Sequence, residues 1–162
     1  MFEYVAKGKV WKFGDYIDTD TIINARYLKN PNPKEWIKHV MESIRPGFGE
    51  NVKKGDIIVA GKCFGYGSAR EHAVIVFKEM GISAMLAESF ARVFFRNAVN
   101  NGIPVIECKD ITVNVEEGDI LEVNLSKGII RNLTKGTLLR TAPLPDFILK
   151  LIMRGGLMKR RE

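Results

Sequence analysis

Three short apolar runs divide the middle of the chain into evenly spaced segments. They are residues 57–61 (IIVAG), 82–88 (ISAMLAE) and 103–108 (IPVIEC). Continuous apolar runs of this length, bounded by glycine or polar residues, are typical of strands that are buried on both faces. We therefore expect three buried strands in this part of the chain.

The residues between these runs have the spacing and the end signals of helices. One helix is expected to end near Met80, and another to span residues 89–101 with Ser89 as its cap. Gly81 and Gly102 follow these segments directly, where the left-handed end of a helix favours glycine. Strands that alternate with helices over short connections predict a parallel sheet with right-handed crossovers.

The two ends of the chain have a different pattern. In the C-terminal third, turns that contain glycine separate short segments, which is typical of hairpins. Proline at a first helical position and apolar residues at helical spacing predict a helix at 33–44, followed by a loop. The further strands expected are residues 4–14, 111–115, 120–125, 128–133 and 137–142, the loop is 45–56, and a closing helix is expected at 145–156. The sequence thus predicts one α/β domain over residues 1–162, with a parallel α/β centre and antiparallel flanking strands.

Composition is that of an ordinary globular protein. Of the 162 residues, 46% are hydrophobic and 27% are charged. The longest apolar runs are far shorter than the roughly 20 residues that cross a bilayer. The N-terminal residues lack the basic and then apolar pattern of a secretion signal. We expect a cytoplasmic protein without membrane contact.

The net charge of +6 raises the question of a polyanionic partner. Basic residues are scattered along the chain, and only the tail at 158–162 (MKRRE) is dense. A nucleic-acid interface normally gathers lysine and arginine on one stripe, so we expect no nucleic-acid partner. The tail has two interpretations, a solvated end or a contact for an acidic partner or substrate.

Cys63 and Cys108 are the two cysteines of the sequence, and they are far apart in the chain. They lack the close pairing of zinc or redox motifs, so we expect small, buried or half-buried side chains and no metal site. A metal cluster, if the protein uses one, must therefore come from another chain.

The sequence GKCFGYGSAREHA at 61–73 follows an expected parallel strand and precedes a helix. Ligands of open α/β sheets bind at this edge. Glycines such as Gly67 let the backbone approach a ligand, and Ser68 is expected at or near the helix N-cap, where an anion is attracted. Arg70 adds a fork of donors that suits a carboxylate. The loop therefore favours a ligand that carries a carboxylate.

Other loop motifs do not fit. A dinucleotide fingerprint needs glycine where Arg70 stands, and a phosphate-binding P-loop needs a lysine followed by serine or threonine. A nucleophile elbow needs the pattern Gly-x-Ser-x-Gly, which is absent here. Glu71 is expected to cap or to pair locally, and His72, one turn past Ser68, to pack or hydrogen-bond behind the site.

Residues 15–21 (DYIDTDT) hold three aspartates and two threonines. Such side chains bond nearby backbone amides, which predicts a capped turn. A turn alone does not explain why so many carboxylates lie together.

Taken in order, DTDTII, GYGSAREHA and ESFARVFFRNAVNNGIP resemble the aconitase family, and within it the small subunits of isopropylmalate isomerases. The resemblance covers nearly the whole chain and is most specific between residues 13 and 108. It implies a β/β/α swivelling domain, equivalent to the C-terminal domain of aconitases. It also implies dehydration and rehydration of a hydroxy-polycarboxylic acid through an alkene, with a [4Fe-4S] cluster held by three cysteines of a large partner subunit.

The resemblance also implies roles for individual residues. Ser68 matches the serine base, Arg70 matches an arginine that binds a substrate carboxylate, and Asp20 matches an acidic residue that orients its neighbours. Gly67 and Ala69 line the same site, and Ala69 stands where aconitases have a second serine. The loss of that hydroxyl leaves the substrate open.

Specificity is expected in the loop at Tyr27, Leu28, Lys29 and Asn30. Related isopropylmalate enzymes tend to have apolar residues there, and homoaconitase-like enzymes arginine. Lys29 could pair with an additional carboxylate or point to solvent. Isopropylmalate is the first expectation, with homoaconitate or a methylated malate or citrate as the alternative. A standalone enzyme, or a binding module for a small carboxylate or nucleic acid, remains open as a different class.

Overall fold

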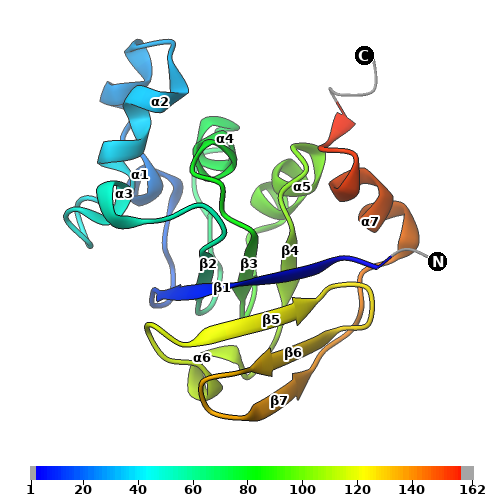
Figure 1. Ribbon diagram of the computed structural model, residues 1–162. Coiled ribbons are helices and arrows are strands. Elements are labelled where there is room, and N and C mark those ends of the chain that lie inside the picture. The colour runs from blue at the N-terminus through cyan, green and yellow to red at the C-terminus, as the bar shows by residue number, and fades with distance from the viewer. Residues whose placement is uncertain (1–2, 158–162) are drawn as a thin grey trace.

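The computed structural model describes residues 3–157, and its strands form one seven-stranded mixed sheet in the order β4-β3-β2-β1-β5-β6-β7 (Figure 1). The strands are β1 (Val5–Lys12), β2 (Ile57–Ala60), β3 (Ala84–Ala87), β4 (Val105–Glu107), β5 (Ile120–Asn124), β6 (Ile129–Asn132) and β7 (Thr137–Arg140). β1, β2, β3 and β4 are parallel to one another, whereas β5, β6 and β7 form an antiparallel meander. The predicted parallel centre with antiparallel flanks is confirmed.

The helices are α1 (Thr19–Ile22), α2 (Pro33–Trp36), α3 (Phe48–Asn51), α4 (His72–Glu79), α5 (Arg92–Asn100), α6 (Ile111–Asn114) and α7 (Asp146–Met153), with the 3-10 turns η1 (Ala25–Lys29) and η2 (Ile37–His39). A row from α2 through α4 and α5 to α7 lies along one side of the parallel strands, whereas α6 lies apart from it, beside the antiparallel strands (Figure 1). Gly81 (φ 76°) and Gly102 (φ 77°) end α4 and α5 in the left-handed conformation, as predicted.

β1 joins the two halves of the sheet. Its first part, Val5–Lys9, pairs antiparallel with β5, and its last part, Val10–Lys12, pairs parallel with β2. Figure 1 shows β1 and β5 running across β2, β3 and β4 at a steep angle. The sheet therefore bends at β1.

Two hydrophobic cores lie on opposite faces of the parallel strands. Successive strand residues point to opposite faces, so Ile58 and Ala60 of β2 face the helical core with α4 and α5. Ile57 and Val59 face a second core, which includes α6 and the antiparallel strands. Burial on both faces explains why these strands are continuous apolar runs.

The expected helix at 33–44 is wrong beyond its first turn. α2 continues only as the 3-10 turn η2, and Met41 then takes a left-handed φ of 58°. The amide of Met41 donates instead to the carbonyl of Ile22 at 3.0 Å, and the Met41 side chain is fully buried. Tertiary packing here outweighs helix periodicity. The expected loop at 45–56 likewise contains the short helix α3.

The expected strand at 111–115 is the helix α6. The apolar residues Ile111, Val113 and Val115 alternate as in a strand, but Ile111 and Val115 are fully buried and Val113 is 80% exposed. The two buried residues are one helical turn apart, so they face the same core from a helix. Three apolar residues in five positions fit both the two-residue period of a strand and the 3.6-residue period of a helix, so the pattern does not distinguish the two structures.

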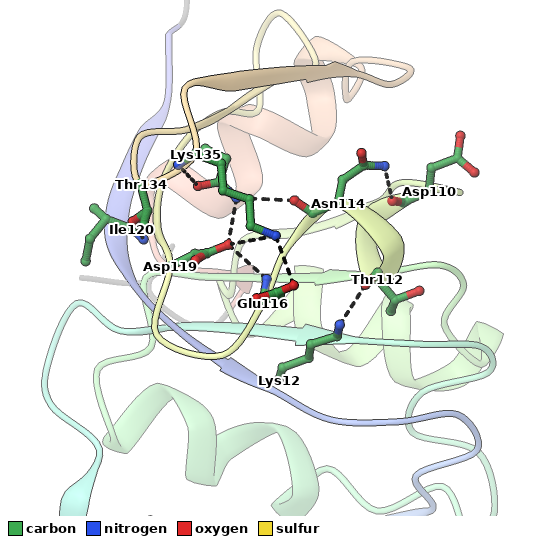
Figure 2. A network of polar contacts seen from close by, with 10 residues as sticks. Lys12, Asp110, Thr112, Asn114, Glu116, Asp119, Ile120, Thr134 and Lys135 are labelled. Atoms are coloured by element: carbon green, nitrogen blue, oxygen red, sulfur yellow. Dashed lines mark hydrogen bonds and ion pairs between the residues drawn. The ribbon is translucent and has the colours of Figure 1, made fainter.

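A buried polar cluster ties the turn before β5 to the loop after β6 (Figure 2). Asp119 Oδ2 accepts from the amide of Glu116 at 2.9 Å and from Asn132 Nδ2 at 2.8 Å, and Lys135 Nζ lies 3.8 Å away. Burial alone would raise the pKa of Asp119, but the hydrogen bonds and the charges of Lys135 and Lys12 together lower it. The cluster holds the antiparallel half together.

In residues 3–157, no helix has the length and apolar character required to cross a membrane. The basic tail at 158–162 lies outside the described residues.

Candidate functional site

The aspartate-rich segment and the glycine loop lie side by side. The amide of Gly65 donates to the carbonyl of Ile17 at 2.7 Å, and the amide of Thr19 donates to the carbonyl of Tyr66 at 2.9 Å. Asp18 and Tyr66 form an isolated parallel bridge. The two segments that the resemblance singled out therefore share one surface.

Each of the three aspartates in this segment has a distinct contact. Asp15 Oδ1 accepts from the amide of Lys62 at 2.8 Å, which fixes the start of the glycine loop. Asp18 caps α1 by accepting from the amide of Thr21 at 2.7 Å. Asp20 forms an ion pair with Arg70. The capped turn is confirmed, and the clustering of carboxylates is explained by contacts to the loop as well as within the turn.

The glycine loop is anchored on the start of α5. Phe64 is buried against the rings of Phe90 and Phe94, with centroids 6.0 and 5.3 Å away. Gly65 has φ 85°, and a Cβ added there would lie 2.3 Å from Cγ of Phe94. Glycine is therefore required at position 65 both for backbone conformation and for space.

Ser89 supports this loop rather than capping α5. Its hydroxyl accepts from the amide of Cys63 at 2.8 Å, and its carbonyl accepts from the amide of Phe64 at 3.0 Å. α5 begins at Arg92, with Ala91 before it, so the expected helix start at Ser89 is wrong. The serine bonds the neighbouring loop because the carboxyl ends of β2 and β3 lie at one edge.

Ser68 and Arg70 line one small hollow of about 150 Å³, which we call the Ser68 hollow. The glycine loop, α1 and the start of α5 form its walls; the lining residues are Thr19, Gly65, Tyr66, Gly67, Ser68, Ala69, Arg70, Ala91, Arg92, Val93, Phe94 and Asn97. Complete small-molecule sites usually have about 300–1,000 Å³ and enclose most of their ligand. This hollow is too small and too open to be a complete site, which suits one wall of a site between two chains.

Ser68, expected at or near the helix N-cap, lies three residues before the cap residue. α4 begins at His72, and Glu71 precedes it as the cap residue without a side-chain cap bond. Ser68 lies in the exposed loop before the helix, where its carbonyl accepts from the amide of Arg70 at 2.8 Å. Within residues 3–157, neither its hydroxyl nor the amides of Gly67, Ser68 and Ala69 form a hydrogen bond. Three successive backbone donors thus remain available to a ligand beside Ser68.

Arg70 is held by the aspartate-rich segment. Nη2 donates to Asp20 Oδ1, and Nη1 donates to the carbonyl of Ile23 at 3.4 Å, a long contact. The Arg70 side chain is 21% exposed and that of Asp20 is 61% exposed. The guanidinium is thus oriented from one side, and its other donors can meet a carboxylate.

His72 and Glu71 do not line the Ser68 hollow. The exposed ring of His72 packs edge-on against Trp36, with centroids 5.2 Å apart, and Glu71 accepts from Asn101 Nδ2 at 3.0 Å. His72 therefore packs, as expected, but on the surface between α2 and α4.

The expected specificity loop forms η1 and the residue after it. The ring of Tyr27 stacks on His39 with centroids 3.6 Å apart, and its hydroxyl donates to Glu42. Leu28 packs against the helical core, whereas Lys29 and Asn30 are exposed. The carbonyl of Asn30 accepts from Trp36 Nε1 at 2.8 Å.

Tyr27 and Asp20 lie on a second hollow of about 170 Å³, and Lys29 and Asn30 lie outside both hollows. Glu42 and His39 also line this second hollow, and no sequence motif pointed to either residue. Hydrogen bonds from Tyr27 and then from His39 lower the pKa of Glu42. Of the four residues expected to set specificity, Tyr27 alone shares a hollow with Asp20, and Asp20 in turn pairs with Arg70 of the Ser68 hollow.

Cys63 is half-buried in the glycine loop, and Cys108 is buried, as expected. Burial raises the pKa of the Cys108 thiol, which keeps it protonated. Over residues 3–157, no three side chains of histidine, cysteine, aspartate or glutamate are grouped so as to hold a metal ion. Where a cluster would be held stays a prediction.

The start of α5 was missed as part of the site. Val93, Phe94 and Asn97 line the Ser68 hollow together with Thr19 of α1. The parallel order of β2 and β3 contained the signal, because segments that follow neighbouring parallel strands meet at one edge.

Known proteins have sequences similar to that of this chain. The model of the aconitase C-terminal domain matches residues 38–110. The 3-isopropylmalate dehydratase small subunit of Halothermothrix orenii is 52% identical over 154 residues, which cover 95% of this chain and 93% of that protein. The isopropylmalate/citramalate isomerase small subunit of Methanocaldococcus jannaschii is 54% identical, over 95% of this chain and 92% of that protein.

A solved structure extends the match to the fold. The crystal structure of 3-isopropylmalate dehydratase from Methanocaldococcus jannaschii superimposes with a TM-score of 0.90 at 40% identity and covers 96% of this chain and 92% of that one. The matched family and the fold together define the swivelling class of aconitase C-terminal domains. Within that class, the chain belongs to the family of 3-isopropylmalate dehydratase small subunits.

Proposed function

We propose that this chain is the small subunit of a two-chain hydro-lyase that interconverts 2-isopropylmalate and 3-isopropylmalate in the cytoplasm. The observation that carries the proposal is the Ser68 hollow, which places Ser68, Arg70 and three unpaired amides on one open wall. The relatives are named as small subunits of such enzymes, which supports a large subunit as the other wall.

Ser68 is the proposed base. As the alkoxide, its oxygen takes the proton from the carbon next to a carboxylate while hydroxide leaves the neighbouring carbon, which forms an alkene. Hydroxide then adds to the carbon that lost the proton, and Ser68 returns its proton to the carbon that lost the hydroxyl, which restores the alkoxide. A hydroxyl is a weak base at neutral pH, so the negative oxygen needs stabilisation. The unpaired amides beside Ser68 are placed to supply it, in the manner of an oxyanion hole.

Arg70 is the proposed carboxylate ligand, and Asp20 its positioning residue. The ion pair with Asp20 fixes the guanidinium plane, so that the remaining donors present a carboxylate to Ser68. Gly67 and Ala69 leave room for the substrate beside the serine. The chemistry that a [4Fe-4S] cluster on the large subunit supplies when bound is Lewis-acid activation of the substrate hydroxyl.

The first test is reconstitution. The purified chain, a cluster-bearing large subunit and the anaerobic mixture of both are assayed with isopropylmalate, homocitrate and citrate. We expect the chain alone to be inactive and the mixture to turn over isopropylmalate with the highest kcat/KM. Turnover by the chain alone would favour a standalone enzyme, and no gain on mixing would rule out the proposed assembly. Faster turnover of homocitrate would replace the substrate but keep the mechanism.

A further inference from the structure

A groove of about 650 Å³ lies between α5 and α7. Figure 1 shows α5 and α7 side by side at the end of the helical row. Phe95, Phe147 and Leu151 line the groove together with Arg92 and Arg96. Phe147 is 72% exposed, an unusual position for a phenylalanine that forms the wall of an apolar groove.

Backbone contacts explain why the groove is open. The C-terminal ends of the two helices meet at glycines: a Cβ at Gly102 would lie 2.4 Å from the carbonyl carbon of Gly155. A Cβ at Gly156 would likewise lie 2.3 Å from the carbonyl oxygen of Asn100. Phe147 and Arg92 lie at the opposite, N-terminal ends of their helices. The helices are thus fixed at one end, and the groove is a built feature of the fold.

The charge of the groove indicates what it binds. Arg92 and Arg96 are one turn apart on α5, and within the described part of the chain neither guanidinium makes a hydrogen bond or an ion pair. The Glu107 carboxylate also lines the groove, where it accepts from the amide of Phe90 at 2.8 Å. Two unpaired guanidiniums beside an apolar floor complement an apolar segment with carboxylates next to it.

The groove is continuous with the proposed active-site wall. Arg92 lines both the Ser68 hollow and the groove, and Val93, on the same helix, is 44% exposed beside Ser68. A chain that covers Ser68 therefore also meets α5. Stable interfaces bury about 800 Å² and about 20–30 residues on each partner, whereas twelve residues line the Ser68 hollow. The docking surface must extend beyond the site, and the groove lies next to it.

We propose that the groove between α5 and α7 docks the large subunit, through an apolar segment of that subunit whose acidic residues pair with Arg92 and Arg96. The inference rests on the proposed two-chain function. Phe147 serves as the exposed aromatic contact, and the guanidiniums set the register of the acidic segment.

The test compares the affinity of variants for the purified large subunit, measured anaerobically by calorimetry or sedimentation. Phe147→Asp and Arg96→Glu each place a negative charge on the groove. The control, Leu138→Asp, places a negative charge on β7, which lies at the opposite edge of the sheet from β4. We expect Kd to rise at least tenfold for the two groove variants and to change less than twofold for Leu138→Asp. Circular dichroism checks that all three variants fold.

The outcomes separate this inference from the proposed function. If Phe147→Asp and Arg96→Glu bind as tightly as the unaltered chain, while the mixture turns over substrate, the docking site is wrong and the proposed function stands. If the variants instead convert an oligomer of the isolated chain to monomers without changing Kd, a second copy occupies the groove, and the inference is also overturned. With weakened docking, turnover should recover as the concentration of the variant chain is raised.

Discussion

Arg70 depends on a residue far away in the sequence. Its guanidinium lies between the glycine loop and α1, where Asp20 and the carbonyl of Ile23 hold it. The motifs predicted that Asp20 and Arg70 belong to one site, and the structure brings them into contact. The free amides at Gly67, Ser68 and Ala69 were not predictable, because a sequence does not show which backbone donors are left unpaired.

Arg70→Lys tests the carboxylate role. A lysine keeps the positive charge but loses the two-pronged geometry, so we expect KM for isopropylmalate to rise about tenfold, as expected for the loss of one charged hydrogen bond. Asp20→Asn keeps the guanidinium but removes the charge that orients it, and we expect a smaller rise in KM. Steady-state kinetics of the reconstituted complex measure the KM of both variants. An unchanged KM in Arg70→Lys would remove Arg70 from the substrate site.

At the scale of elements, sequence reasoning located the central strands and helices well, since continuous apolar runs and glycine ends agree there. It misplaced the 33–44 segment, where the amide of Met41 bonds to Ile22 of another segment. It predicted a strand at 111–115, because the three apolar residues there fit the period of a strand as well as that of a helix. Contacts with distant residues decided these cases, and no local pattern contains them.

Gly65→Ala tests how the glycine loop is held on α5. We expect two costs: a left-handed φ of 85° in a residue with a side chain, and the clash of its Cβ with Phe94. The matched control is Gly118→Ala, where φ is 87° and no other atom lies within 4 Å.

We expect Gly118→Ala to lower the free energy of unfolding by about 1–2 kcal/mol and Gly65→Ala to lower it by more, as backbone strain and overpacking add. Urea denaturation of both variants measures the difference. Equal losses would show that contact between the loop and Phe94 does not constrain position 65.

At the scale of the whole molecule, the bent sheet separates the half that carries the candidate site from the half that is held by the Asp119 cluster. The parallel half carries the glycine loop and the groove at its helical side, while the antiparallel half is closed by the Asp119 cluster. The mixed sheet was predictable from the change of pattern after Cys108. The bend at β1 was not predictable, because the sequence does not show that this one strand pairs with both halves of the sheet.

Asp119 gives the stability of the antiparallel half a pH dependence. Its pKa in the folded protein is lower than in the unfolded chain, so the stabilisation is present above the unfolded value of about 3.9 and is lost as the pH falls below it. Asp119→Asn removes the charge. At pH 7 we expect a loss of about 1–3 kcal/mol in the free energy of unfolding, as for a buried acceptor that loses its partners.

Denaturant unfolding at pH 7 and at more acidic pH values compares Asp119→Asn with the unaltered chain. We expect the difference between them to shrink as the pH falls. Asp110→Asn is the control, because the Asp110 carboxylate caps no helix and the change should have little effect. A difference for Asp119→Asn that stays constant with pH would contradict the charged cluster.

The central claim is that this chain supplies the base of an active site completed by another subunit. Ser68→Ala in the anaerobically reconstituted complex tests it most directly, with turnover of isopropylmalate and the Kd between the subunits measured on the same samples. We predict that kcat falls at least a hundredfold, the scale of a lost general base, while Kd stays within twofold of the unaltered complex. Unchanged turnover in an intact complex would contradict the claim.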